Sequence, residues 1–197
     1  MILATESFRS DSCSIRNSAL MAFTALTKRL LNNLHVQDQD LSRTRGLTVW
    51  EFLYKYQELS EYFLAKLREG LRSTTKKEDK EKEDLVNFSI LLLISRLIPS
   101  FQMVELDTSI LKKSRDDSIR EYIDLIKEYS RNATYFVRKI SAQALLPLIK
   151  FEDYVSQEIP KYFQELLSSI SSDGKPMKQN HAHGVVVRIN VFVSAYF

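Results

Sequence analysis

A near-repeat within the chain constrains its fold more than any other feature of the sequence. Residues 132–149, NATYFVRKISAQALLPLI, have a near copy at residues 11–26, DSCSIRNSALMAFTAL. One constant spacing places Ile15 on Val137 and Arg16 on Arg138. In both copies, apolar and small residues recur every three or four positions, which places them on one helix face. The repeat therefore predicts two equivalent amphipathic helices.

The content of each copy indicates which kind of helical protein this is. A turn, then Val or Ile followed by Arg, then a helix of small residues ending in leucines is typical of the second helix of a HEAT or armadillo repeat. The spacing between the copies fits about three repeats of roughly 40–47 residues. We expect an all-α chain, with residues 1–197 forming a single α-solenoid segment. The apolar text runs to Phe197 without a polar capping repeat, so we expect a fragment of a longer protein.

Apolar spacing and capping signals predict the other helices. A helix over about 14–32 is followed by a possible capping box at Thr48 and Glu51, with a break at 58–60. The apolar run 85–98 should be a helix that Pro99 ends. A variable segment over 100–117 precedes a second possible capping box, Ser118 and Glu121. Pro147 should end or kink the helix of the second repeat copy near residue 146.

Three stretches remain: two allow an alternative secondary structure, and one is predicted as a loop. Residues 73–84, which include KKEDKEKED, are predicted as a charged flexible loop, with a ragged helix end as the alternative. SSDGKP, within 171–176, is a loop. The valine-rich segment 180–197 is interpreted as a helix, although its propensity would equally allow a strand.

Composition indicates the class of protein and the cellular compartment that fit this chain. The chain is 44% hydrophobic with 4 Gly and 4 Pro, which argues for a folded, helix-rich protein. Its net charge of +3 permits contact with nucleic acid but does not demand it. Cys13 is the only cysteine, so no internal disulfide can form, and a reducing, cytoplasmic setting fits. We expect no signal peptide and no membrane span, because the most apolar run, 85–98, is too short for a bilayer.

Few residues suggest chemistry. The sequence has no GxxxxGK[ST], GxGxxG or GxSxG motif, and no enzyme class is supported. Cys13 is interpreted as a structural thiol in a turn rather than a nucleophile. His181 and His183 could bind a metal, as in a hydrolase, but a catalytic site needs a third ligand and residues two apart do not share a helix face. We expect no metal or cofactor, and either a polar helix start capped by Asn180 or hydrogen bonds to a partner or RNA.

The basic residues fall into two groups. Arg16 and Arg138 are interpreted as structural, each bridging to an acidic or amide side chain such as Asp11 or Asn132. Loops and ridges are the places where repeat proteins usually carry function. The candidate contacts with RNA or a partner are Arg43, Arg45, Lys112, Lys113, Arg115, Arg131, Lys139, Asn180, His181 and His183.

Five blocks in order resemble a known family. They are SIRNSALMAFTALTKRLL, RTRGLTVWEFLYKYQELSEYFLAKL, NFSILLLISRLIPS, YFVRKISAQALLPLI and KQNHAHGVVVRI. Together they resemble the C-terminal conserved region of the thyroid adenoma-associated protein (THADA) family. The most specific blocks are residues 16–19 and the QNHxHG of residues 179–184.

The resemblance implies a fold and a function. Members of that family are very long α-solenoids, and they include regulatory subunits of a tRNA ribose methyltransferase. They partner a separate FtsJ-like enzyme, which uses S-adenosylmethionine, and direct it to the 5′ side of the tRNA anticodon loop. The catalytic residues and the cofactor would belong to that partner. The expectation is a non-catalytic adaptor, and the alternative is a general HEAT-repeat scaffold for protein partners.

Overall fold

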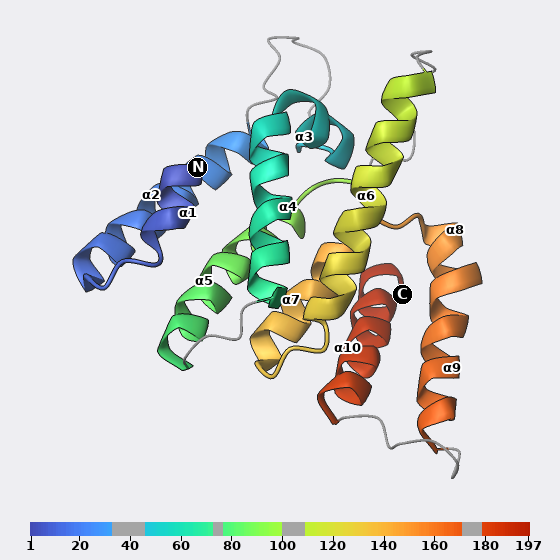
Figure 1. The fold of residues 1–197 in the computed structure, drawn as a ribbon. Coiled ribbons are helices and arrows are strands. Elements are labelled where there is room, and N and C mark those ends of the chain that lie inside the picture. The colour runs from blue at the N-terminus through green and yellow to red at the C-terminus, as the bar shows by residue number, and fades with distance from the viewer. Residues whose placement is uncertain (33–45, 73–76, 100–108, 171–178) are drawn as a thin grey trace. The chain divides into compact units, whose positions relative to one another are not determined.

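The computed structural model describes residues 1–32, 46–72, 77–99, 109–170 and 179–197. It divides into two compact units, Met1–Ser100 and Phe101–Phe197. In the described ranges the regular structure is helical apart from one isolated bridge (Figure 1). The predicted all-α helical-repeat fold is confirmed, whereas the expectation of a single segment over residues 1–197 stays a prediction.

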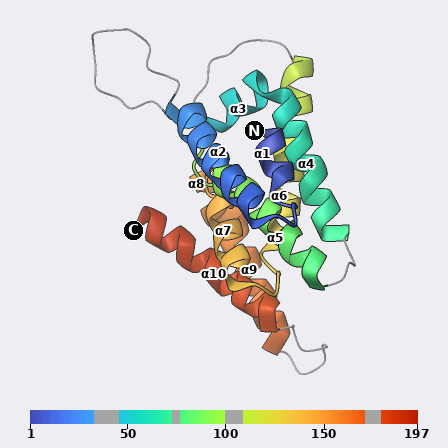
Figure 2. The same cartoon turned by 90° about the vertical axis from the view of Figure 1, so that its left-hand side faces the viewer.

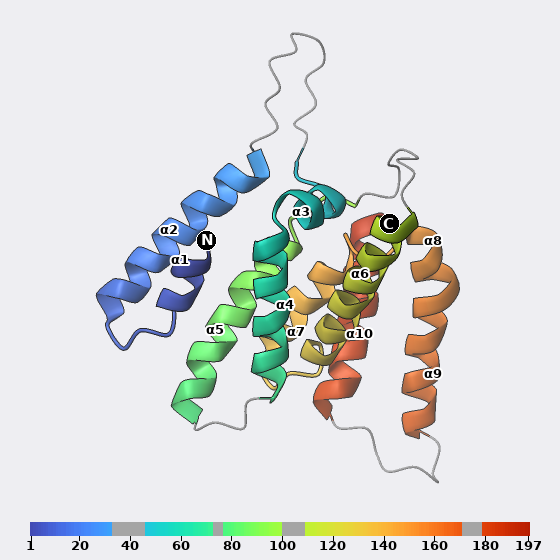
Figure 3. The ribbon, with the colours of Figure 1, turned by 45° about the horizontal axis from the view of Figure 1, so that its top comes forward.

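The described residues of unit one form two helix pairs and a short connecting helix. Its elements are α1 (Ile2–Ser7), α2 (Cys13–Asn32), α3 (Val49–Lys55), α4 (Gln57–Arg72) and α5 (Lys77–Ile94). Helix α1 packs on α2 and α5, and α4 packs on α3 and α5 (Figure 3). Phe63, Leu67, Ile90 and Leu91 are fully buried between these helices. Each such side chain contributes about 1.5–3 kcal/mol to folding.

The predicted capping box at the start of α3 is present. Thr48 Oγ1 accepts from the Glu51 backbone N–H at 3.1 Å, and Glu51 Oε2 accepts from the Thr48 N–H at 3.1 Å. The same segment is hydrogen-bonded to the residues that follow α5. Val49 donates its N–H to the Ile98 carbonyl at 3.0 Å, and Ile98 donates to the Leu47 carbonyl at 2.9 Å. Ile98 is extended there because Pro99 follows it.

Three expectations for unit one are wrong in detail. The break between α3 and α4 falls at Tyr56, earlier than residues 58–60. Residues 77–84 are not a loop but the first part of α5, which matches the ragged-helix alternative, while 73–76 lie outside the described residues. The charge run has partners: Lys82 pairs with Asp11, and Glu83 accepts from Arg9 at 2.6 Å. Helix α5 ends at Ile94, before Pro99 could end it.

Unit two is a layered set of longer helices. Its elements are α6 (Ser109–Tyr129), α7 (Tyr135–Leu145), α8 (Phe151–Asp153), the short π-helix η1 (Tyr154–Glu158), α9 (Ile159–Ile170) and α10 (Gln179–Tyr196). Helix α7 packs against both α6 and α10, and α10 also packs against α9 (Figure 2). The core between them includes Tyr122, Ile126, Leu145, Tyr154 and Phe192.

The boundaries of unit two test several more expectations. The predicted stop of α7 before Pro147 and the helical last segment, now α10, are confirmed. The predicted start at Ser118 is wrong: α6 begins at Ser109 and runs through that position, because residues 109–117 hold no Gly or Pro to interrupt it. The short π-helix η1 comes just before Pro160. Proline has no N–H to donate to the carbonyl four residues earlier, so the α-helical bonding pattern is interrupted there.

Two further expectations concern the chain as a whole. The loop SSDGKP lies outside the described residues. In the ranges that are described, no helix combines the length and apolar character needed to cross a bilayer.

Candidate functional site at the start of helices α7 and α10

Arg138 holds together the turn that precedes α7. Its side chain is buried, and Nη1 donates to the backbone carbonyls of Asn132 at 2.6 Å and Ala133 at 2.7 Å. Hydrogen bonds from a charged donor are roughly twice as strong as neutral ones. The arginine therefore fixes the path of the chain from α6 into α7.

Arg16 makes the same contacts in the other copy of the repeat. Its Nη1 donates to the carbonyls of Ser10 at 2.7 Å and Asp11 at 2.9 Å, which align with Asn132 and Ala133. The expected acceptors in these turns, the side chains of Asp11 and Asn132, are replaced by backbone oxygens. We call this arrangement of one guanidinium on two turn carbonyls the arginine clamp.

The clamp of Arg138 extends into α10. Arg138 Nε donates to His183 Nδ1 at 3.1 Å, and Nη1 lies 3.4 Å from Asn180 Oδ1. The guanidinium also lies 6.0 Å from the centre of the Tyr135 ring. Because His183 accepts through Nδ1, its ring proton is on Nε2. Asn180 is the second residue of α10, so it binds Arg138 from within the helix instead of capping it.

Gly184 allows α10 to lie unusually close to the end of α6. A Cβ atom at this position would lie 1.9 Å from the carbonyl oxygen of Ser130. Backbone cannot retreat as a flexible side chain can, so any larger residue would push the two segments apart. The QNHxHG block, residues 179–184, thus ends with the glycine at which α10 lies against the end of α6.

His181 faces the opposite side of α10 from His183, as expected for helix residues two apart. Its Nε2 lies 3.3 Å from Glu165 Oε2 in α9, and the same oxygen accepts from Arg188 Nη2 at 3.3 Å. Partial burial, with the charge of Arg131, lowers the pKa of His181 despite the nearby carboxylate. The two histidines cannot chelate one metal in this geometry, and the described residues contain no group of three potential ligands.

Exposed side chains surround the outer end of α7. Tyr135 is 45% exposed and Phe136 68%, with their ring centres 5.7 Å apart. The His183 ring stands edge-on to the Tyr135 ring, with the ring centres 5.6 Å apart. Lys139, which is exposed, follows Tyr135 by one turn on the same face of α7. We call these four residues the aromatic ledge. Such a surface suits stacking of unpaired bases beside a cation that contacts phosphate.

The other predicted contact residues lie in the turn after α6, elsewhere in α10, or outside the described part of the chain. Arg131 lies in the turn after α6 and donates to Glu128 at 2.6 Å. Arg43 and Arg45 lie outside the described residues. Lys112, Lys113 and Arg115 belong to α6 rather than to a loop, and their side chains also lie outside the described part. Cys13 is exposed at the first position of α2, not held in a turn.

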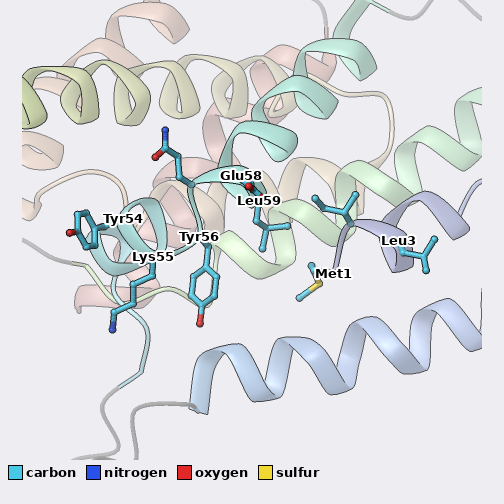
Figure 4. A pocket seen from close by; sticks show the side chains of 9 residues that line it. Met1, Leu3, Tyr54, Lys55, Tyr56, Glu58 and Leu59 are labelled. Atoms are coloured by element: carbon cyan, nitrogen blue, oxygen red, sulfur yellow. The ribbon is translucent and has the colours of Figure 1, made fainter.

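Two surface pockets lie within the separate units. The one in unit one, about 600 Å³, lies where α3 meets α4, and Figure 4 shows side chains from that junction and from α1 around it. Its charged groups are Lys55 and Glu58, and Lys55 pairs with Glu51 at 3.9 Å. Among the described residues, its lining has no Ser, Cys or His that could act as a nucleophile or base. The pocket in unit two, about 390 Å³, lies beside Arg131, Glu165 and Arg188.

Sequence reasoning missed four residues that shape this region. Tyr135 and Phe136 stand at the start of α7, where an exposed aromatic pair next to a turn was a readable signal. Arg188 was the single charge in VVVRINVFV, and a lone charge in an apolar run usually has a specific partner. Its partner Glu165 carried no such signal.

These helix pairs, clamps and close helix contacts define an α-helical repeat protein. The chain belongs to the family described as Trm732, C-terminal TPR repeats, whose model matches residues 16–192. Sequence patterns favoured HEAT or armadillo repeats and the family is described as TPR. All three are α-solenoids built from stacked helical repeats, so the architecture is the same in outline.

Curated relatives carry a shared name. The chain is 29% identical over 191 residues to a mouse protein named tRNA (32-2′-O)-methyltransferase regulator THADA. It is 25% identical over 190 residues to the human protein of that name and 26% identical over 191 residues to the chicken protein. Each alignment covers 96% of this chain but only 9% of the relative. No solved structure matches the chain.

Proposed function

We propose that this chain is part of a non-catalytic regulatory subunit that helps a separate methyltransferase modify tRNA. The partner would be an FtsJ-like enzyme that carries S-adenosylmethionine, and the target a ribose 2′-hydroxyl in the anticodon loop. The observation that carries the proposal is the alignment of 96% of the chain with relatives named as regulators of tRNA 2′-O-methylation.

The aromatic ledge supplies a physical reason for RNA contact. Anticodon loops are single-stranded, and proteins recognise such loops by stacking bases on aromatic side chains. Tyr135 and Phe136 present exposed rings, while Lys139 and His183 add N–H donors beside them. Each base stacked on an aromatic ring contributes about 1–3 kcal/mol of binding free energy. A rigid surface of this kind can position the ribose hydroxyl without chemistry of its own.

The proposal is tested by measuring 2′-O-methylation of tRNA anticodon loops in cells that lack the parent gene. Re-expression of the full-length protein should restore methylation. A Phe136→Ala, Lys139→Ala variant should restore it only in part, because it removes one stacking ring and one phosphate contact. The matched control is Phe163→Ala, Lys161→Ala, which makes the same changes at exposed positions of α9.

Two outcomes would contradict the proposal at different levels. Unchanged methylation after gene deletion removes the regulatory role. Normal methylation with the ledge variant, alongside loss of activity only when other parts of the parent are altered, assigns RNA contact elsewhere. Affinity capture that recovers protein partners but neither a methyltransferase nor tRNA would favour a general repeat scaffold instead.

A further inference from the structure

The pocket of about 390 Å³ in unit two contains an unusual arginine. Arg188 has a side chain only 2% exposed, although it carries a permanent charge. Its guanidinium lies over the Tyr162 ring at 4.1 Å, which restricts its movement. Its Nη2 donates to Glu165, but among the described residues its buried Nε has no hydrogen-bond partner. A buried donor without an acceptor is unfavourable, because it has lost its water and gained no bond, unless a ligand completes it.

Glu165 does not satisfy Arg188 in the way a dedicated partner would. One carboxylate oxygen, Oε2, is shared between Arg188 and His181 at 3.3 Å each. A bidentate arginine–carboxylate pair would use both oxygens at about 2.7–2.9 Å. The geometry therefore leaves acceptor capacity on Glu165 and donor capacity on Arg188, and both residues line the pocket.

The charges that line the pocket restrict the kind of ligand. Carboxylates outnumber cations in the lining: Glu121, Asp124, Glu128 and Glu165 against Lys127, Arg131 and Arg188. A phosphate would meet repulsion from the carboxylates, and a polycation would meet the buried guanidinium. The ligand that fits is neutral and presents acceptors to the arginine and donors to a carboxylate.

We propose that this pocket, with Arg188, Glu165 and Asp124 on its wall, binds the edge of an unpaired guanine base in RNA. Guanine presents O6 and N7, the acceptors that arginine recognises most often, and also N1–H and N2–H₂ donors for a carboxylate. A pocket of this volume lies within the range of about 300–1,000 Å³ that holds small ligands. The inference rests on the proposed role in tRNA recognition and adds a base preference to it.

The experiment uses the full-length protein and single-stranded RNAs of about ten nucleotides. One central position is guanosine, inosine, 7-deazaguanosine or adenosine in an oligouridine background, and binding is followed by fluorescence anisotropy. We expect the guanosine strand to bind about ten-fold more tightly than the inosine strand, which lacks the 2-amino donor, and than the 7-deaza strand, which lacks the N7 acceptor.

Variants then assign that preference to the pocket. Glu165→Gln and, separately, the exposed Asp124→Asn should reduce the preference for guanosine over inosine. Glu152→Gln, which removes the same charge from α8, should keep it. A 6-thioguanosine strand should photocrosslink to the peptides that carry Leu125 or Arg188, both of which line the pocket.

The outcomes separate this proposal from the proposed function. Equal affinity for the guanosine, inosine and adenosine strands, or crosslinks confined to Tyr135 and Phe136, would overturn the guanine pocket while leaving the regulatory role intact. Failure to bind any of the strands, together with unchanged tRNA methylation after gene deletion, would overturn both.

Discussion

Helices α2 and α7 begin with the same device but are held differently. Arg16 and Arg138 each donate to two backbone carbonyls at aligned positions of the preceding turn. Arg138 also contacts a second helix, through His183 and Asn180, and among the described residues Arg16 has no such bond. The apolar residue before each arginine is also more buried in α7 than in α2: Val137 is 2% exposed and Ile15 is 49% exposed.

The difference separates two tasks that one sequence pattern serves. In α2 the arginine closes a turn and acts locally. In α7 the same arginine also sets the position of α10, because its Nε bond to His183 adds a link between helices. A repeat motif in sequence therefore specifies the local turn, whereas the contacts beyond the turn depend on the residues that the neighbouring helix supplies.

The largest expected effect comes from breaking the close approach of α10. Gly184→Ala should lower the free energy of unfolding by about 3 kcal/mol, because the new Cβ would meet the Ser130 carbonyl. This loss should exceed the gain of about 1 kcal/mol that alanine brings to a helix interior. Chemical denaturation followed by circular dichroism measures the change.

A glycine in unit one provides the control for that substitution. At Gly46 a Cβ would lie 2.7 Å from Ile98 Cδ1, the tip of a flexible side chain that can move. Gly46→Ala should therefore cost only about 1 kcal/mol. If the two substitutions cost the same, the backbone contact at Ser130 does not fix the position of α10.

The two clamps can be compared directly. Arg138→Met should cost about 2–3 kcal/mol, because it leaves Asn132 and Ala133 carbonyls and His183 without a charged donor. Arg16→Met should cost about 1 kcal/mol, since only a more exposed turn is released. Hydrogen exchange read peptide by peptide shows where protection is lost.

The location of that loss is as informative as its size. The α7 variant should loosen peptides from both α7 and α10, and the α2 variant only those of its own turn. Loss of protection confined to residues 130–138 in Arg138→Met would show that the bonds to α10 carry little energy. Any difference in stability between the two variants would then come from the different solvent exposure of the two turns.

The smallest expected effect is a pH dependence from His181. Its pKa in the folded chain lies below the ordinary value of 6.5, through burial and the charge of Arg131. The unfolded chain binds a proton first as pH falls, so the stabilisation is complete above about pH 6.5 and is lost as pH drops through the lower folded pKa. The denaturation midpoint should decrease between pH 7.5 and pH 5.5.

His181→Gln tests the assignment because glutamine keeps a donor for Glu165 but does not titrate. The variant should show a weaker dependence on pH over that interval than the parent chain. An unchanged slope would assign the effect to other groups, and a midpoint that rises on acidification would contradict the direction of the His181 shift.

The sequence predicted elements better than their ends. The helices of both repeat copies, the Thr48–Glu51 capping box and the helical last segment follow from apolar spacing and capping chemistry, which act within a few residues. The charge run at 77–84 was misread because its partners, Arg9 and Asp11, are distant in sequence. The start of α6 was misplaced because a possible cap does not end a helix that has no breaker before it.

The candidate site was less predictable for the same physical reason. His183 and Asn180 were chosen as contact residues, yet both bond to Arg138, forty or more residues earlier in the chain. No periodicity reveals such a pairing. The pocket beside Arg188 depends on side chains from three helices, so its mixed charge is visible only once α6, α9 and α10 are placed.

The arginine clamp also has a consequence for alignment of related sequences. Because the guanidinium reaches the carbonyls five and six residues before it, the number of residues between turn and arginine is fixed by geometry. One inserted residue would rotate the arginine by about 100° around the helix. Insertions should therefore be absent from this interval wherever the clamp occurs. That invariant length gives a way to locate equivalent turns along relatives of which this chain matches only 9%.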